Sequence, residues 1–156
     1  MSKKKLYRPN VAAVIMSPGY PKEKKVLLAE RSDIAGVWQF PQGGIDKGES
    51  SKKALLRELK EEIGTKKVDV IARYPDWLKY DFPKYVAKRM RPYSGQKQRY
   101  YLVRLKKKAV IDLDTKHPEF INYRFVEIDK LLDNISHFKK PIYKQVIDYF
   151  TEEGLL

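Results

Sequence analysis

The chain has 156 residues, no cysteine and a formal net charge of +13. The lack of cysteine excludes disulfides and thiolate metal sites, and a content of 42% hydrophobic residues excludes a disordered chain. No apolar run approaches the roughly 20 residues of a membrane-spanning helix, and the basic start is not followed by the apolar stretch of a signal peptide. We therefore expect one cytoplasmic domain over residues 1–156, with 1–6 as a flexible tail.

The positive charge bears on the choice of partner. Lys and Arg number 33, against 20 Asp and Glu. Such an excess favours polyanions, namely nucleic acid, nucleotide polyphosphates or an anionic membrane surface. A lysine-rich surface without any such partner is the alternative, and charge alone does not decide between them.

The N-terminal third of the chain predicts two strands and a loop. Residues 10–16 (Asn-Val-Ala-Ala-Val-Ile-Met) form an apolar run that ends at Ser-Pro-Gly, which is typical of a buried strand. Residues 25–30 predict a second strand. The segment 32–48 contains four glycines and Pro41, and we expect a structured loop there.

Residues 50–63 give the clearest helical pattern. Ser50 or Ser51 can cap the N-terminus, and Gly64 can end the helix. Apolar residues repeat at helical spacing, at Leu55, Leu56, Leu59 and Ile63. Carboxylates fall on an adjoining face, at Glu58, Glu61 and Glu62. Their mutual repulsion indicates a site for a hard divalent cation such as Mg²⁺ or Mn²⁺, with a solvated charged helix face as the alternative.

The rest of the chain interleaves further strands with helices. Strands are expected at 68–74, 99–105 and 123–126, and helices at 128–135 and 141–150. Pro141 suits the first turn of the last helix. Strands that alternate with helices predict an α/β layered domain.

The segment 75–99 is longer than a simple strand connection needs. It carries seven Lys or Arg residues and five interleaved aromatic residues, Trp77, Tyr80, Phe82, Tyr85 and Tyr93. Cationic groups can follow a phosphate backbone while aromatic rings stack on bases, so we expect a nucleic-acid surface. For each aromatic residue taken singly, a place in the core is an equal alternative.

The residues around the glutamates favour a metal site over a plain charged face. Gly43 and Gly44 allow the loop to approach a ligand closely, and Glu49 lies where its carboxylate can meet the helix amides. Arg57 can orient the loop by bonding to backbone oxygens. The pattern of these residues resembles the Nudix box at every fixed position. It consists of Gly43, Glu49 after a gap of five residues, and the run 57–64 (Arg-Glu-Leu-Lys-Glu-Glu-Ile-Gly) after a gap of seven.

The resemblance to Nudix hydrolases implies an α/β fold, an α/β/α sandwich with a mixed central sheet, and hydrolysis of phosphoric anhydrides with Mg²⁺ (Mn²⁺ as an alternative). It implies that Glu58 and Glu62 are metal ligands and that Glu61 is a ligand or assists the catalytic water. Gly43 belongs to the implied metal site, and Arg57 to the implied catalytic group. A bound metal would neutralise phosphate charge and activate the attacking water.

Four further segments resemble the bacterial RNA pyrophosphohydrolases, which are closely similar to proteins described as diadenosine polyphosphate hydrolases. These segments are 7–11, 38–44, 95–100 and 118–120. The resemblance implies removal of pyrophosphate or phosphate from the 5′ end of tri- or diphosphorylated RNA, which leaves a monophosphate and primes mRNA decay. It also implies that Glu119 is a further metal ligand or activates water.

The same resemblance implies a set of substrate-binding residues, namely Arg8, Arg31, Gln42, Tyr80, Phe138 and Lys139. Arg8, Arg31 and Lys139 would contact phosphates. Phe138 would stack on a base, with a role as a hydrophobic staple of the last helix as the alternative. His117 and His137 have no partner visible in the sequence, and we interpret both as bystanders.

Two other functions stay open at this point. A dinucleoside polyphosphate hydrolase would use the same chemistry, because both substrates offer a nucleoside attached to a phosphate chain. A non-catalytic RNA-binding module would keep the fold, although it would have no need of a repulsive carboxylate cluster. The pattern indicates neither a protein activator nor an oligomeric state.

Overall fold

The computed structural model describes residues 4–156. Residues 1–3, which belong to the predicted flexible tail, lie outside this range. Lys5 forms an ion pair with Asp81 at 2.7 Å. The Leu6 carbonyl accepts a hydrogen bond from the amide of Ser94 at 2.8 Å. The chain is therefore bonded to the rest of the fold from residue 5 onward.

The described residues form one mixed sheet. Its strands are β1 (Tyr7–Met16), β2 (Lys25–Arg31), β3 (Trp38–Gln39), β4 (Gln42–Gly44), β5 (Val68–Arg73), β6 (Leu78–Asp81), β7 (Gly95–Leu105) and β8 (Phe120–Glu127). The central order is β3-β2-β1-β7-β5, with β8 beside β2, β4 beside β1 and β6 beside β7. β1 and β7 run parallel along the whole of β1, whereas the other pairs are antiparallel.

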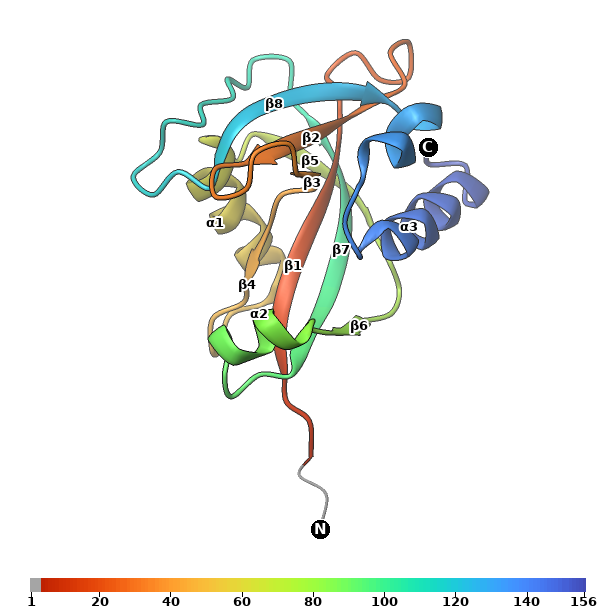
Figure 1. The fold of residues 1–156 in the computed structure, drawn as a ribbon. Helices are drawn as coiled ribbons and strands as arrows, with labels where there is room; N and C mark the ends of the chain where they lie inside the picture. The colour runs from red at the N-terminus through yellow and green to blue at the C-terminus, as the bar shows by residue number, and fades with distance from the viewer. Residues whose placement is uncertain (1–3) are drawn as a thin grey trace.

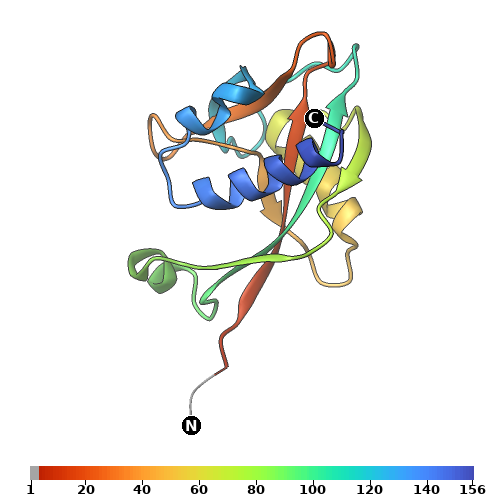
Figure 2. The ribbon, with the colours of Figure 1, turned by 90° about the vertical axis from the view of Figure 1, so that its right-hand side faces the viewer.

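Helices cover both faces of this sheet (Figures 1 and 2). α1 (Ser51–Ile63) lies on one face and α3 (Lys140–Glu152) on the other. Two short helices complete the fold, α2 (Lys84–Arg89) and the 3-10 helix η1 (Ile128–Asn134). The predicted α/β/α sandwich with a mixed sheet is confirmed. Between residues 4 and 156, no helix is long and apolar enough to cross a membrane.

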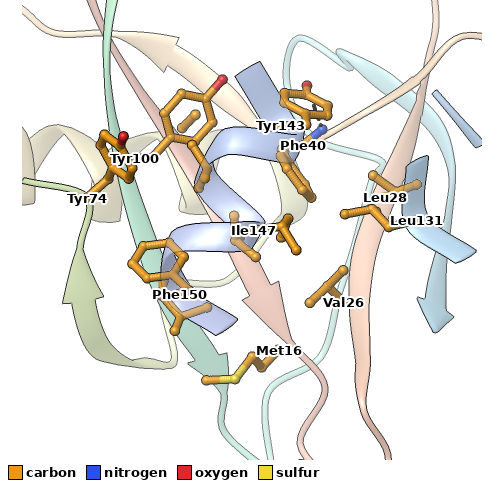
Figure 3. Packing of buried hydrophobic residues seen from close by; sticks show 14 of the residues in the cluster. Met16, Val26, Leu28, Phe40, Tyr74, Tyr100, Leu131, Tyr143, Ile147 and Phe150 are labelled. Atoms are coloured by element: carbon orange, nitrogen blue, oxygen red, sulfur yellow. Dashed lines mark hydrogen bonds between the residues drawn. The ribbon is translucent and has the colours of Figure 1, made fainter. Parts of the chain in front are cut away.

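β1 divides the core because its side chains alternate between the two helical layers. On the α3 side, one cluster of buried side chains includes Met16, Tyr100, Tyr143 and Phe150 (Figure 3). On the α1 side, the core contains Val11, Ala13, Ile15, Leu55, Leu59 and Ile63. Each buried aliphatic side chain of this kind contributes about 1.5–3 kcal/mol of transfer free energy, so the two cores fix the position of α1 and α3 against β1.

β1 and β2 diverge along their length. Their backbones pair at Met16 and Val26, whereas the N-terminal half of β1 pairs with β4 around Val11. The Pro41 carbonyl accepts a hydrogen bond from the Ala13 amide at 3.0 Å. The divergence places β4 against α1, so Gly43 of β4 lies beside Glu58 of the helix, while Gly44 lies beside Arg8.

α1 begins and ends as its sequence predicts. Of the two candidate caps, Ser50 is the one whose side-chain oxygen accepts a hydrogen bond from the Lys53 amide, at 3.2 Å. Gly64 ends the helix in the left-handed region, with φ +76°. Leu55, Leu59 and Ile63 are buried, while Leu56 is only partly buried. The apolar stripe thus holds the helix on the sheet and fixes the direction of its glutamates.

The sequence pattern missed parts of the sheet. β7 begins at Gly95, earlier than predicted, because Gln96 and Gln98 are polar and yet buried by the parallel pairing with β1. β3 and β4 lie inside the predicted loop 32–48, and β6 and α2 lie inside the segment 75–99. These strands are short, and their pairing with longer strands overrides their weak local pattern.

Gly64 provides a test of how α1 is ended. A Cβ added there would lie 2.6 Å from the Asp112 carbonyl oxygen, whereas Gly154, with φ +74°, has no atom within 4 Å of the same position. We expect Gly154→Ala to cost on the order of 1 kcal/mol of unfolding free energy through its φ alone. Gly64→Ala should cost clearly more, because a backbone clash is added to the same strain. Urea unfolding of both variants measures the difference, and equal losses would contradict crowding at Asp112.

Candidate active site

A cleft of about 750 Å³ lies where β1 and β4 meet the C-terminal half of α1 and the segment before β8. Seven predicted site residues line it, namely Arg8, Gln42, Gly43, Glu58, Glu61, Glu62 and Glu119. The cleft therefore combines four carboxylates with a guanidinium. Such a mixture suits a polyanion that is bound partly through cations.

Arg57 joins α1 to the loop that precedes it. Its guanidinium donates two hydrogen bonds to the Glu49 carboxylate, at 2.9 and 2.8 Å, and one to the Gly44 carbonyl at 2.8 Å. Hydrogen bonding from Arg57 lowers the pKa of Glu49 to about 2, so the pair stays ionised at neutral pH. Arg57 thereby fixes β4 against the helix.

Arg57 also contacts two of the predicted metal ligands. It donates hydrogen bonds to Glu58 at 2.9 Å and to Glu61 at 3.3 Å. Burial nevertheless raises the pKa of Glu58, and the charge of Glu61 adds to this rise. Part of the carboxylate repulsion is therefore offset by Arg57, but the cluster keeps an unfavourable excess of negative charge.

Glu62 carries the largest part of that excess. Only 6% of its surface is exposed, and its Oε2 atom has no hydrogen-bond partner in the part of the chain that the structure describes. Burial raises the pKa of Glu62 well above its usual range, and the charges of Glu58 and Glu119 raise it further. A buried carboxylate oxygen without a partner is costly, and a bound cation would supply the missing interaction.

The surroundings of Glu62 fit a hard divalent ion. The donor set consists of carboxylates, which Mg²⁺ and Mn²⁺ prefer. Gly43 lies so close that an added Cβ would be 1.9 Å from the Glu58 carboxyl carbon, so only glycine allows the backbone to approach the cluster. As they stand, no three acidic, His or Cys side chains among residues 4–156 converge closely enough to hold a metal ion; Arg57 supplies the positive charge between Glu58 and Glu61 instead.

Four of the six predicted substrate-binding residues contact one another. Lys139 Nζ donates a hydrogen bond to Gln42 Oε1 at 2.6 Å and lies 5.6 Å from the centre of the Tyr80 ring. The Tyr80 ring lies 5.2 Å from that of Phe138. Phe138 is 47% exposed, so its ring is accessible to a base. If Phe138 were instead a hydrophobic staple, its ring would pack against α3. The ring that lies beside Tyr143 of α3 is that of His137.

A buried polar network holds Gln42 and Lys139 in place. Gln98 Nε2 donates to Gln42 Oε1 and to Asn10 Oδ1, both at 2.9 Å, and Tyr100 donates to Gln98 Oε1 at 2.7 Å. Burial lowers the pKa of Lys139 to about 7, and the charge of Arg31 contributes. A bound phosphate would restore the full positive charge of this ammonium.

The two arginines occupy different places. Arg8 lines the cleft and its guanidinium lies against Gly44. Arg31 is bound bidentately by the Asp33 carboxylate. It lies near enough to lower the pKa of Lys139, but it does not line the cleft itself. Arg31 would thus face the base-binding side of the site rather than the glutamates.

The two histidines also differ. His137 Nε2 donates to the Trp38 carbonyl at 3.0 Å, because a carbonyl can only accept. Burial lowers the pKa of His137 to about 4, so the ring is neutral and packs between β3 and α3. His117 lines the cleft beside Glu119.

Sequence reasoning missed several polar residues of the cleft, including Asn10, Gln96 and Thr115. Asn10 and Gln96 lie on the same face as Arg8, because paired residues of β1 and β7 share a face. Alternation within β1 and β7 could have revealed them, but only once the parallel pairing of these strands was known.

The NUDIX domain model matches residues 6–146 of the chain. The chain belongs to the NUDIX family. This NUDIX protein is 60% identical over 151 residues to the RNA pyrophosphohydrolase of a Nitratiruptor species, with 97% of each chain covered. It is 58% identical to the RNA pyrophosphohydrolase of Campylobacter jejuni over 156 residues, the full length of both. For that of Helicobacter pylori, the identity is 55% over 97% of this chain and 98% of the relative.

Solved structures share the fold of this chain. The Escherichia coli dihydroneopterin triphosphate pyrophosphohydrolase has a TM-score of 0.73 at 20% identity, covering 94% of this chain and 97% of its own. A Caenorhabditis elegans Ap4A hydrolase has a TM-score of 0.71 at 18% identity, covering 93% and 96%. At these identities the likeness concerns the fold alone. NUDIX hydrolases generally use divalent metal ions, which agrees with the Glu62 Oε2 atom that lacks a partner among the described residues.

The buried carboxylate makes a prediction for the metal-free protein. The pKa of Glu62 is raised on folding, so ionisation of this group destabilises the native state. This destabilisation begins as the pH rises above the pKa of a glutamate in the unfolded chain, and it is complete above the pKa of the folded state. Glu62→Gln, a neutral isostere, should therefore stabilise the metal-free protein at pH 8 by at least about 1 kcal/mol. The gain should vanish near pH 4, where the wild-type group is protonated.

Glu61→Gln is the matched control, since the Glu61 side chain is 57% exposed and should show no such gain. Chemical unfolding with a chelator present measures all three proteins. A Glu62→Gln variant that is no more stable than the wild type at pH 8 would contradict the unfavourable burial of this carboxylate beside Glu58 and Glu119.

Proposed function

We propose that the chain is a metal-dependent RNA 5′-pyrophosphohydrolase, which removes pyrophosphate or phosphate from 5′-tri- or diphosphorylated RNA and leaves a monophosphate. The observation that carries the proposal is the position of the buried Glu62 carboxylate, whose Oε2 atom has no partner among the described residues, in one cleft with Arg8 and Gln42. Gln42 in turn contacts the cationic and aromatic group of Lys139, Tyr80 and Phe138. Relatives with 55–60% identity that are named RNA pyrophosphohydrolase support it.

The proposed metal is Mg²⁺, with Mn²⁺ as an alternative. Glu58, Glu62 and Glu119 would hold it, with Glu61 as a further candidate and Gly43 giving the backbone access to the cluster. When bound, the metal would neutralise phosphate charge and lower the pKa of water. If Glu58 left Arg57 to bind the metal, Arg57 would still be bonded to Glu49 and to the Gly44 carbonyl. The loop before α1 would therefore keep its position.

Each remaining residue has a role that follows from its place. Arg8 and Lys139 would offset the charge of the phosphates as negative charge develops. Glu61 and Glu119 are exposed in the cleft, so a carboxylate oxygen of either can accept the proton of the water that attacks phosphorus. Phe138 offers an exposed ring on which the first base can stack. RNA of this kind is found in the cytoplasm, which is the location that we propose.

The segment 75–99 supports RNA over a plain nucleotide substrate. None of its five aromatic residues is in either core; Tyr85 is 69% exposed and Trp77 is 37% exposed. Accessible rings among seven cationic residues suit a single-stranded nucleic acid. A dinucleoside polyphosphate would use the same cleft but would not need the cations and aromatic rings of this segment. A purely binding role leaves the buried Glu62 carboxylate without a purpose.

Glu58 gives the test of this proposal. Glu58→Gln should abolish release of pyrophosphate and phosphate from triphosphorylated RNA, by at least about 100-fold in kcat, while circular dichroism shows an intact fold. The matched control is Glu152→Gln, an exposed change near the end of α3, which should keep full activity. Near-normal turnover by the Glu58→Gln variant in the presence of Mg²⁺ would contradict the proposed metal-dependent hydrolysis.

A further inference from the structure

The sheet carries a second polar face that the proposed chemistry does not use. β6 pairs with β7 so that Lys79 lies opposite Lys97. β5 pairs with β7 so that Arg73 lies opposite Tyr101. Residues that are paired in this way share a face. Because Tyr101 belongs to the α1-side core, these cations lie on the α1 side, whereas Tyr80, Gln96 and Arg8 point to the opposite side, toward the substrate-binding residues.

The arrangement of these cations is unfavourable by itself. Lys79 and Lys97 are direct cross-strand partners of like charge, a pairing that destabilises a sheet. Arg99 lies near Arg73, and its Nε atom is buried with no hydrogen-bond partner among the described residues. Burial lowers the pKa of Arg99, and the charge of Arg73 lowers it further. A structure that crowds cations and leaves a buried donor unpaired is suited to an anionic ligand.

Aromatic rings hold the cations in place. The Lys79 ammonium lies 5.2 Å from the centre of the Tyr7 ring, and the Lys97 ammonium lies 5.3 Å from the centre of the Trp77 ring. The Arg99 guanidinium lies 4.8 Å from the same Trp77 ring. These contacts order long side chains that would otherwise be mobile, while Lys79, Trp77 and Arg73 remain exposed.

The patch continues toward α1 and borders the edge of the sheet. A depression of about 630 Å³ extends from Arg73 to Ser51 and Lys52. In the other direction lies β6, which pairs with β7 alone among the described strands. β6 presents Tyr80 to the substrate-binding side and Lys79 to the patch. A chain that leaves the first-base site beside Tyr80 can thus cross β6 and reach Lys79.

We propose that the α1-side patch of Arg73, Trp77, Lys79, Lys97 and Arg99 binds the phosphodiester backbone of the substrate RNA downstream of its 5′ end. The inference rests on the proposed function and extends it to the body of the RNA. Unpaired cations beside an exposed aromatic ring match the alternating phosphates and bases of a single strand. The patch would raise affinity for long RNA without touching the reacting phosphates.

The test compares substrate length. In the variant Arg73→Gln, Lys79→Gln, Lys97→Gln, we expect KM for a triphosphorylated, unstructured RNA of about 20 nucleotides to rise at least about tenfold at 0.1 M salt. The slope of log KM against log salt should fall by about two, since each lost phosphate contact contributes about 0.7 for a single strand. KM and kcat for a triphosphorylated trinucleotide, which is too short to cross β6, should not change.

A control variant removes the same charge elsewhere, as Lys22→Gln, Lys107→Gln, Lys108→Gln in exposed loops. It should leave KM for the long RNA within about twofold of the wild type. Equal losses in both variants, loss on the trinucleotide as well, or no change with the long RNA would each overturn the proposal. Failure of the wild-type protein to hydrolyse either RNA would instead refute the proposed function, so the two failures are distinguishable.

Discussion

Repulsion among the carboxylates of α1 is the constraint on which the rest of the site depends. Helical spacing forces Glu58, Glu61 and Glu62 together, and the apolar stripe of α1 turns Glu62 inward, where it is buried. Arg57 offsets part of this charge and also bonds the Gly44 carbonyl and Glu49. The residual charge falls on Glu62. The metal-free fold therefore stores an unfavourable interaction that a divalent cation bound at Glu62 would relieve, and such binding would link metal affinity to native-state stability.

Strand alternation then gives the two faces of the sheet different sets of polar side chains. β1 and β7 run parallel, so one set of their side chains faces α3 and the other faces α1. Arg8, Asn10 and Gln96 line the cleft, and Gln98 fixes Gln42 from the same face. Lys97 and Arg99 point the other way. One long strand can thus contribute to the cleft on one face and to a separate cationic surface on the other.

Much of the fold follows from the sequence because local and tertiary preferences agree in α1. Ser50, Gly64 and the leucine repeat each mark the helix, and the glutamate spacing marks the site. Agreement is weaker in β7, where Gln96 and Gln98 are buried polar residues whose burial depends on β1 and on mutual hydrogen bonds. β3, β4 and β6 were not predicted because they are short and form only through pairing with longer strands. The contact between Lys139 and Gln42, which lie far apart in the sequence, follows only from the folded arrangement.

The most direct test of the central claim compares two substrates under one set of metal conditions. Triphosphorylated RNA and diadenosine tetraphosphate would each be incubated with the wild-type protein and Mg²⁺, and kcat/KM would be measured with the products identified. A 5′-monophosphorylated RNA as product, with a higher kcat/KM for RNA than for the dinucleotide, is the predicted result. A strong preference for the dinucleotide would contradict the assignment of RNA as the substrate.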